Sequence, residues 1–175
     1  MNRSVRTAAA VLGAGVLATP LAAGAMLATG AVDASAARVH AETLRYYQVD
    51  GPTRFYNADW KAINVDPPQT LPTAGDSFDV LDTDYAGSFS HHAKRWTMTD
   101  HLTCTFSSAD NAVCDGQFAS GGSLLLVNHV AIVPSKNTFH LPISEGTGAF
   151  AGAHGTVTIF ANLPNGNSNI VIKVR

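Results

Sequence analysis

Near the end of this 175-residue chain lies the segment Phe139-His-Leu-Pro-Ile-Ser-Glu-Gly-Thr-Gly-Ala-Phe-Ala-Gly-Ala-His-Gly-Thr-Val-Thr-Ile159. Two apolar runs flank four glycines, Gly146, Gly148, Gly152 and Gly155. Glycines allow positive φ angles and close backbone approach, and their density prevents a helix between the runs. The stretch therefore predicts a strand, a glycine corner and a second strand.

A nucleotide-binding loop is the rival interpretation of these glycines, because Gly146-Thr-Gly-Ala-Phe-Ala151 fits the G-x-G-x-x-G/A pattern. That pattern needs a helix after it, but the β-branched run Thr156–Ile159 follows instead. It also needs a distant acid for the ribose, and no Asp or Glu follows Glu145. A P-loop fails as well, since no Lys-Ser or Lys-Thr follows the glycines.

The N-terminus carries the pattern of a secretory signal peptide. Arg3 and Arg6 precede an apolar stretch that runs to about Val32, and Ala34-Ser-Ala36 follows as a small-residue cleavage motif. We predict a signal peptide over residues 1–36, a single mature domain over residues 37–175, and a secreted, extracellular protein without membrane contact after cleavage. The apolar stretch is long enough to span a bilayer, so an uncleaved anchor is the alternative.

The charge pattern argues against nucleic acid as a partner. The formal net charge is −2, and no basic run or arginine-rich segment stands out.

Cys104 and Cys114 are the two cysteines of the chain, and both lie in the mature domain. The segments around them alternate like strands, and Ser107–Asn111 between them has turn chemistry. A hairpin there sets the two cysteines opposite each other, which in an oxidising compartment predicts a disulfide. The alternative is a catalytic or metal-binding thiol pair.

Short strand-like runs recur along the mature chain, without any long helical periodicity. They predict an all-β fold, an eight-stranded antiparallel closed barrel, with a two-sheet sandwich as the alternative. Residues 50–75 are rich in proline and aromatics and predict a long ordered loop over the barrel. The predicted strands are Thr43–Val49, Asp76–Asp84, Trp96–Phe106, Ala112–Phe118, Ser123–Val133, Thr138–Ile143, Thr156–Asn162 and Asn169–Val174.

Both faces of Ser123–Val133 are mostly apolar. An apolar outward face needs a partner, which favours a homo-oligomer.

Three elements of the sequence resemble the allene oxide cyclase and dirigent-protein barrels, including secreted bacterial members. They are Gly75-Asp-Ser-Phe-Asp-Val-Leu-Asp-Thr-Asp-Tyr-Ala-Gly87, the paired strands around the cysteines, and Leu141–Val157 with its G-x-G-x-aromatic and G-x-x-G pattern. The resemblance implies an eight-stranded barrel, often trimeric, with a pocket for an apolar or phenolic small molecule. It also implies cyclisation, isomerisation or coupling of that molecule without a metal or organic cofactor.

Candidate site residues lie on the strand within Gly75–Gly87. Phe78, Val80, Asp82 and Asp84 share one face, so Phe78 and Val80 would bind a ligand while the acids catalyse. Asp82 matches an acidic position of the dirigent motif, although the neighbouring family acid is Leu81 here. A carboxyl beside an apolar pocket has a raised pKa and can transfer protons. A solvated strand end is the alternative.

Further candidates depend on which face points inward. If the disulfide lies outside the barrel, His101 and Thr103 line the interior, His101 as a proton relay and Thr103 as a ligand contact. A structural histidine is the alternative. Either Tyr46 or Tyr47 must point inward, and we select Tyr47 as a ligand contact, with ordinary aromatic packing as the alternative for either residue. Glu42 does not fit the register of the glutamate that allene oxide cyclases use.

Other histidines suggest no metal site. His91-His92 and the scattered His129, His140 and His154 lack ligand spacing.

The leading hypothesis is a cofactor-free cyclase or isomerase. The alternative is a non-catalytic extracellular module that binds a small ligand or a partner, and a structural secreted protein is a third possibility.

Overall fold

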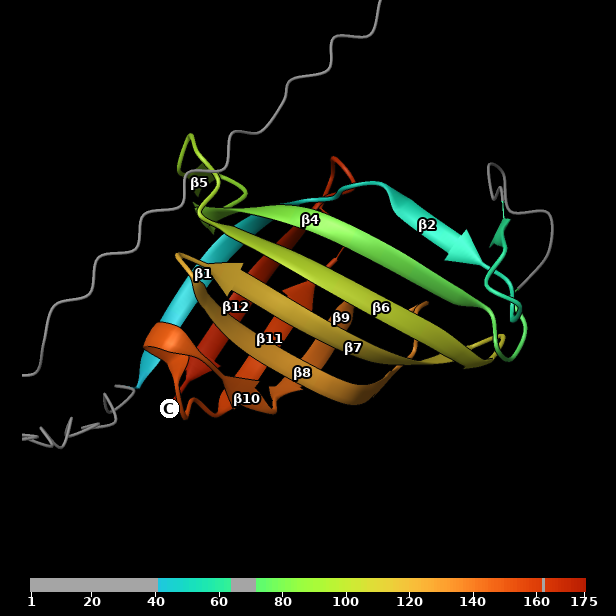
Figure 1. Ribbon diagram of the computed structural model, residues 1–175. Coiled ribbons are helices and arrows are strands. Elements are labelled where there is room, and N and C mark those ends of the chain that lie inside the picture. The colour runs from blue at the N-terminus through green and yellow to red at the C-terminus, as the bar shows by residue number, and fades with distance from the viewer. Residues whose placement is uncertain (1–40, 64–71, 162) are drawn as a thin grey trace, which may run out of the picture. The chain divides into compact units, whose positions relative to one another are not determined.

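The computed structural model describes residues 41–63, 72–161 and 163–175, which fall within one compact unit. The predicted signal peptide and part of the proline-rich loop therefore lie outside the described residues. The described chain is almost entirely β-structure (Figure 1). Its strands are β1 (Glu42–Val49), β2 (Thr53–Tyr56), β3 (Ala62–Ile63), β4 (Ser77–Ser88), β5 (His91–His92), β6 (Met98–Ser108), β7 (Asn111–Ser120), β8 (Ser123–Ile132), β9 (Thr138–Ile143), β10 (Glu145–Gly146), β11 (Gly155–Phe160) and β12 (Ser168–Val174).

The long strands form one antiparallel sheet in the order β10-β8-β7-β6-β4-β1-β12-β11-β9. The chain passes from β9 through Ser144 into β10, and β10 pairs with β8 at the other end of this order, where Glu145 lies opposite Leu126. The sheet thus curls back on itself, and Figure 1 shows β11 and β12 behind β6 and β7. This confirms the predicted antiparallel barrel of eight main strands.

The glycine corner lies between β9 and β11, as the sequence predicts. It contains β10 and a three-residue 3-10 turn, Gly148–Phe150, and so offers no helix to a dinucleotide. A Cβ atom on Gly146 would lie 2.0 Å from the carbonyl oxygen of Phe150, and one on Gly155 would lie 1.8 Å from that of Lys173. Only glycine permits this close packing of the corner against β12.

The predicted loop over residues 50–75 is partly strand. After β1 leaves β4 at the Val49–Thr83 pair, the chain bends at Gly51 and continues along the same edge of β4 as β2, where Thr53 lies opposite Val80. A Cβ atom on Gly51 would lie 1.9 Å from the carbonyl oxygen of Leu81, so the bend requires glycine. β2 lengthens this wall of the barrel (Figure 1).

The predicted disulfide is confirmed. Cys104 of β6 and Cys114 of β7 lie directly opposite each other and are bonded. Both cysteines are about 1% exposed and point into the barrel, where they pack with Phe106 and Ala112.

The interior is divided along the barrel axis. One end is filled by a cluster of thirteen buried residues that includes Met98, Phe118 and Leu125. The other end, towards β2 and the β8–β9 connection, holds a cavity. Burial of the apolar side chains stabilises the filled end.

Candidate functional site

The cavity has a volume of about 210 Å³ and mostly apolar walls. The aromatic rings of Phe78 and Phe139 contribute to these walls, and the disulfide forms part of them. The described residues that line it are Gln48, Asp50, Thr53, Phe78, Val80, Asp82, Leu102, Cys104, Cys114, Ile132, Pro134, Phe139, Leu141, Ile159, Ala161 and Ser168. An apolar cavity with a few convergent polar groups is the usual form of a small-molecule site.

A buried network of acids lies at the inner side of this cavity. Gln48 Nε2 donates to Asp82 Oδ2 at 2.9 Å and to Asp100 Oδ1 at 3.0 Å. The backbone N–H of Gly51 donates to Asp82 Oδ1 at 2.6 Å. Asp82 and Asp100 are direct partners across the β4–β6 ladder. Gln48 and the Gly51 bend therefore fix the carboxyl group of Asp82 at the cavity wall.

Asp84 follows Asp82 on the same face of β4 and is fully buried, with 0% exposure. Neither of its carboxyl oxygens accepts a hydrogen bond from a fixed donor, and Asp100 Oδ2 also lacks one. A carboxyl group without a donor is satisfied if one of two neighbouring acids keeps its proton and donates it to the other. Burial and the neighbouring charge of Asp100 therefore favour the protonated form of Asp84, whose pKa is raised.

No cation compensates these acids in the part of the chain that the structure describes, where the one ion pair joins His101 to Asp79 elsewhere. Burial raises the pKa of Asp82 to about 7, and the charges of Asp100 and Asp50 add to this, while the Gly51 hydrogen bond opposes it. Burial, followed by the charge of Asp100, raises the pKa of Asp84 to about 9. Asp82 can thus donate or accept a proton near neutral pH.

The structure brings together three of the predicted site residues. Phe78, Val80 and Asp82 all line the cavity. Asp84 does not line it and lies behind Asp82, beside Met98 of the filled core. These residues share the inward face of β4, as the alternation of side chains along a strand predicts.

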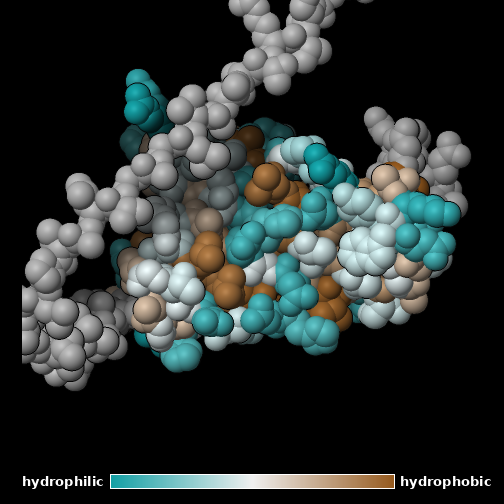
Figure 2. Space-filling model, viewed as in Figure 1, coloured by the Kyte–Doolittle hydropathy of each residue, from teal (hydrophilic) through white to brown (hydrophobic). Residues whose placement is uncertain are grey.

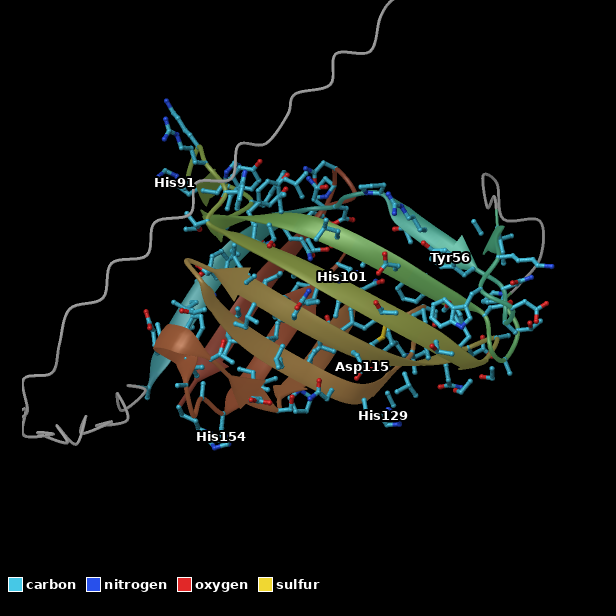
Figure 3. All side chains as sticks on the ribbon, in the orientation of Figure 1. Tyr56, His91, His101, Asp115, His129 and His154 are labelled. Atoms are coloured by element: carbon cyan, nitrogen blue, oxygen red, sulfur yellow. A yellow bond between two sulfur atoms is a disulfide. The ribbon has the colours of Figure 1, made fainter. Side chains whose placement is uncertain are left out.

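The expected inward placement of His101 and Thr103 is wrong. Because side chains alternate along β6 and Cys104 points inward, both residues point outward. There they bond to Asp79 of β4, His101 through Nε2 and Thr103 through Oγ1. They border a shallow groove on the outer surface with Asp115, and Figure 3 labels His101 and Asp115 on this side of the sheet.

Tyr47 also points away from the interior, while its neighbour Tyr46 belongs to the core. The Tyr47 ring stacks on His92 with centroids 4.5 Å apart and lies near Phe89 and Tyr85. The side-chain amides of Asn165 and Asn167 donate to its hydroxyl group. Tyr47 therefore anchors the β4–β5 hairpin and the β11–β12 turn to the outside of the barrel, and it does not line the cavity.

Two members of the site were not predicted, Gln48 and Asp100. Gln48 lies on the same face of β1 as Tyr46, and Asp100 lies on the same face of β6 as Cys104. The signal for Asp100 was present in the sequence, because any face that contains Cys104 must also contain Asp100.

The outer surface mixes polar and apolar side chains (Figure 2). Leu81 is 57% exposed there, and Leu124 and Leu126 of β8 are half-buried. A homo-oligomer stays a prediction.

Among the described residues, no three His, Cys, Asp or Glu side chains are grouped to hold a metal ion. His91, His129 and His154 are dispersed over the surface (Figure 3). No helix in the same part of the chain is long and apolar enough to cross a membrane.

The fold and site define a barrel with an apolar cavity and a buried acid at its wall. Among solved structures, a pyocyanin demethylase is similar, with a TM-score of 0.59 and 13% identity over 77% of this chain and 100% of the other. Two pterocarpan synthase dirigent proteins have TM-scores of 0.53 and 0.50, with 16% and 18% identity over 77% of this chain and 93% and 86% of theirs. The chain thus has the dirigent-like barrel fold that the sequence predicted. No protein-family model and no curated protein sequence matches it.

Proposed function

We propose that this chain is a secreted, cofactor-independent protein that binds an apolar or phenolic small molecule in the cavity and steers its cyclisation, isomerisation or coupling. The observation that carries this proposal is the buried acid Asp82 in the wall of a mostly apolar cavity. The similar proteins are named for action on small organic molecules, pyocyanin and pterocarpans, which supports a small organic substrate for this chain.

The walls would act by holding one reactive conformer of the ligand. Packing against Phe78, Phe139 and the disulfide restricts the ligand, which lowers the entropic part of the barrier. Asp82 would transfer a proton to or from the ligand, because its pKa of about 7 leaves both protonation states populated near neutral pH. Asp84 lies behind Asp82 and does not line the cavity, so it would keep its proton without contacting the ligand.

The first experiment is native mass spectrometry of the secreted mature protein, followed by extraction of any retained compound and uptake from a panel of phenols and lipids. A matched pair of variants tests whether the compound binds in the cavity. Val80→Phe fills the cavity, whereas Leu81→Phe adds the same ring to the outer face of the same strand. We expect uptake by the wild type and by Leu81→Phe, and loss of uptake in Val80→Phe.

Turnover of the identified compound is then compared in Asp82→Asn and in Asp79→Asn, which removes an outward carboxyl from the same strand. A loss of turnover in Asp82→Asn alone, with binding retained, supports acid–base chemistry. If the wild type and the variants take up the compound and none of them converts it, the protein is a non-catalytic binding module and not an enzyme. Absence of uptake by the folded wild type would refute the proposal.

A further inference from the structure

The charge around the cavity is of one sign. Asp82 and Asp50 line it, from β4 and from the β1–β2 bend, and Asp84 and Asp100 lie behind it on β4 and β6. Tyr46 of β1 is the other titratable group beside these acids, and its pKa is raised by burial and by Asp84. β7, β8, β9, β11 and β12 contribute apolar or uncharged side chains to the lining, and none of the described residues that line the cavity is Lys, Arg or His.

We propose that the cavity selects compact aromatic cations, such as a protonated or N-alkylated nitrogen heterocycle, and rejects carboxylates. This inference rests on the proposed function, because it assumes that the cavity binds a small molecule, and it adds that the preferred molecule carries a positive charge on an aromatic ring.

The carboxyl group of Asp82 is buried and lacks a compensating cation among the described residues. Asp82 is 4% exposed, and its two hydrogen-bond donors, Gln48 and Gly51, are neutral groups. A cation beside it would supply the missing opposite charge in a site where water screens poorly. A neutral ligand would leave that charge uncompensated, and a carboxylate would add a second negative charge without any donor cation to receive it.

The walls of the cavity are partly aromatic. Phe78 and Phe139 present aromatic rings to the same cavity. Aromatic faces attract cations, most strongly where both groups are removed from water. The same walls also favour a flat apolar body, so an aromatic ring that carries the charge satisfies both the rings and Asp82.

The volume of the cavity limits the size of the ligand. A volume of about 210 Å³ lies below the ~300–1,000 Å³ typical of drug-sized ligand pockets. A ligand of two or three fused rings suits such a space, whereas a long acyl chain with a carboxylate at its end fits neither its volume nor its charge.

The test uses three bicyclic probes of similar size and different charge: 1-methylquinolinium (cation), 1-methylnaphthalene (neutral) and 1-naphthoate (anion). Affinity is measured by equilibrium dialysis on the mature protein. At about pH 8 we expect the cation to bind at least about tenfold more tightly than the neutral probe, and the anion at least about tenfold more weakly than the neutral probe.

The pH dependence identifies the acid. The cation needs the Asp82 carboxylate, so its affinity should fall by up to about tenfold per pH unit below the Asp82 pKa of about 7, while the affinity of the neutral probe stays constant. Asp82→Asn should abolish the preference for the cation and its pH dependence. Asp79→Asn, which removes an outward charge from the same strand, should keep both.

The outcomes separate this inference from the proposed function. Equal binding of the cation and the neutral probe, or a preference that survives in Asp82→Asn, would overturn the inference while the cavity remains a binding site. Failure of every probe to bind the folded protein would count against the proposed function itself. If Asp82→Asn does not fold, as circular dichroism would show, the pH profile of the wild type decides alone.

Discussion

Replacing Asp84 with Asn should stabilise the protein, and the gain should grow as the pH rises. Asp84 is fully buried, both its oxygens lack fixed donors, and its pKa is raised to about 9. An Asp carboxyl in an unfolded chain has a pKa near ~3.9. The folded state therefore binds one more proton at Asp84 than the unfolded state does over the pH range between these values.

The sign and size follow from proton linkage. Because the folded pKa is the higher one, the contribution of Asp84 to stability is greatest below about pH 4 and is lost as the pH rises towards 9. The loss is about 1.4 kcal/mol per pH unit, or up to about 4 kcal/mol between about pH 5 and pH 8. Asn keeps the shape but does not titrate, and its amide can donate to Asp100.

The assay is urea unfolding of the oxidised protein, followed by circular dichroism at several pH values between about 5 and 8. The difference in unfolding free energy between Asp84→Asn and the wild type should increase by about 1.4 kcal/mol per pH unit. The control is Asp110→Asn in the exposed turn between β6 and β7, for which the difference should stay constant. A constant difference for Asp84→Asn too would show that Asp84 is ionised in the folded protein, and the reasoning would fail.

Two further predictions concern the scaffold. The double variant Cys104→Ala/Cys114→Ala should lose about 2–3 kcal/mol of stability in urea, because the bond closes a short loop, and an unchanged unfolding midpoint would contradict this. Gly155→Ala should lower the melting temperature far more than Gly152→Ala. Both glycines have positive φ angles, but a Cβ atom meets the Lys173 carbonyl only at Gly155 and open space at Gly152. Equal losses would show that the close contact with β12 is not what requires glycine.

Much of the fold could be predicted because its signals are local. The glycine corner and the turn between the cysteines each depend on backbone conformations that few residues adopt. β2 could not be predicted in the same way. Thr53–Tyr56 is short and is flanked by Pro52, and it becomes a strand because the bend at Gly51 lays it along the free edge of β4.

The candidate site could be predicted only in part, because strand alternation defines which residues share a face and leaves open which face points inward. Asp82 and Phe78 were predicted as one group, and the apolar row beside them fixed the direction of β4. On β6, the hypothesis of an external disulfide reversed the direction. His101 and Thr103 were therefore expected inside, and Asp100 was missed.

Tyr47 shows the same ambiguity with a different cause. It is 7% exposed and aromatic, which is typical of a core residue, yet it lies on the outer side of β1. The hairpin of β4 and β5 and the turn before β12 cover it there. Burial by such segments depends on long-range contacts, so no local pattern separates Tyr47 from Tyr46.

The buried acids Asp82, Asp84 and Asp100 form an acid cluster. This cluster lowers the stability of the fold, so its position is informative. Each buried acid without a cation must either keep its proton or bear an uncompensated charge, and apolar residues in its place would avoid that cost. The rest of the barrel interior is almost wholly apolar, so the cluster departs from the pattern that stabilises the fold. The cluster lies at the wall of the cavity, which Asp82 lines. Departures of this kind are expected at functional sites. A cation bound beside Asp82 would offset part of the cost, so ligand binding and the pH dependence of stability should be coupled through the same carboxyl groups.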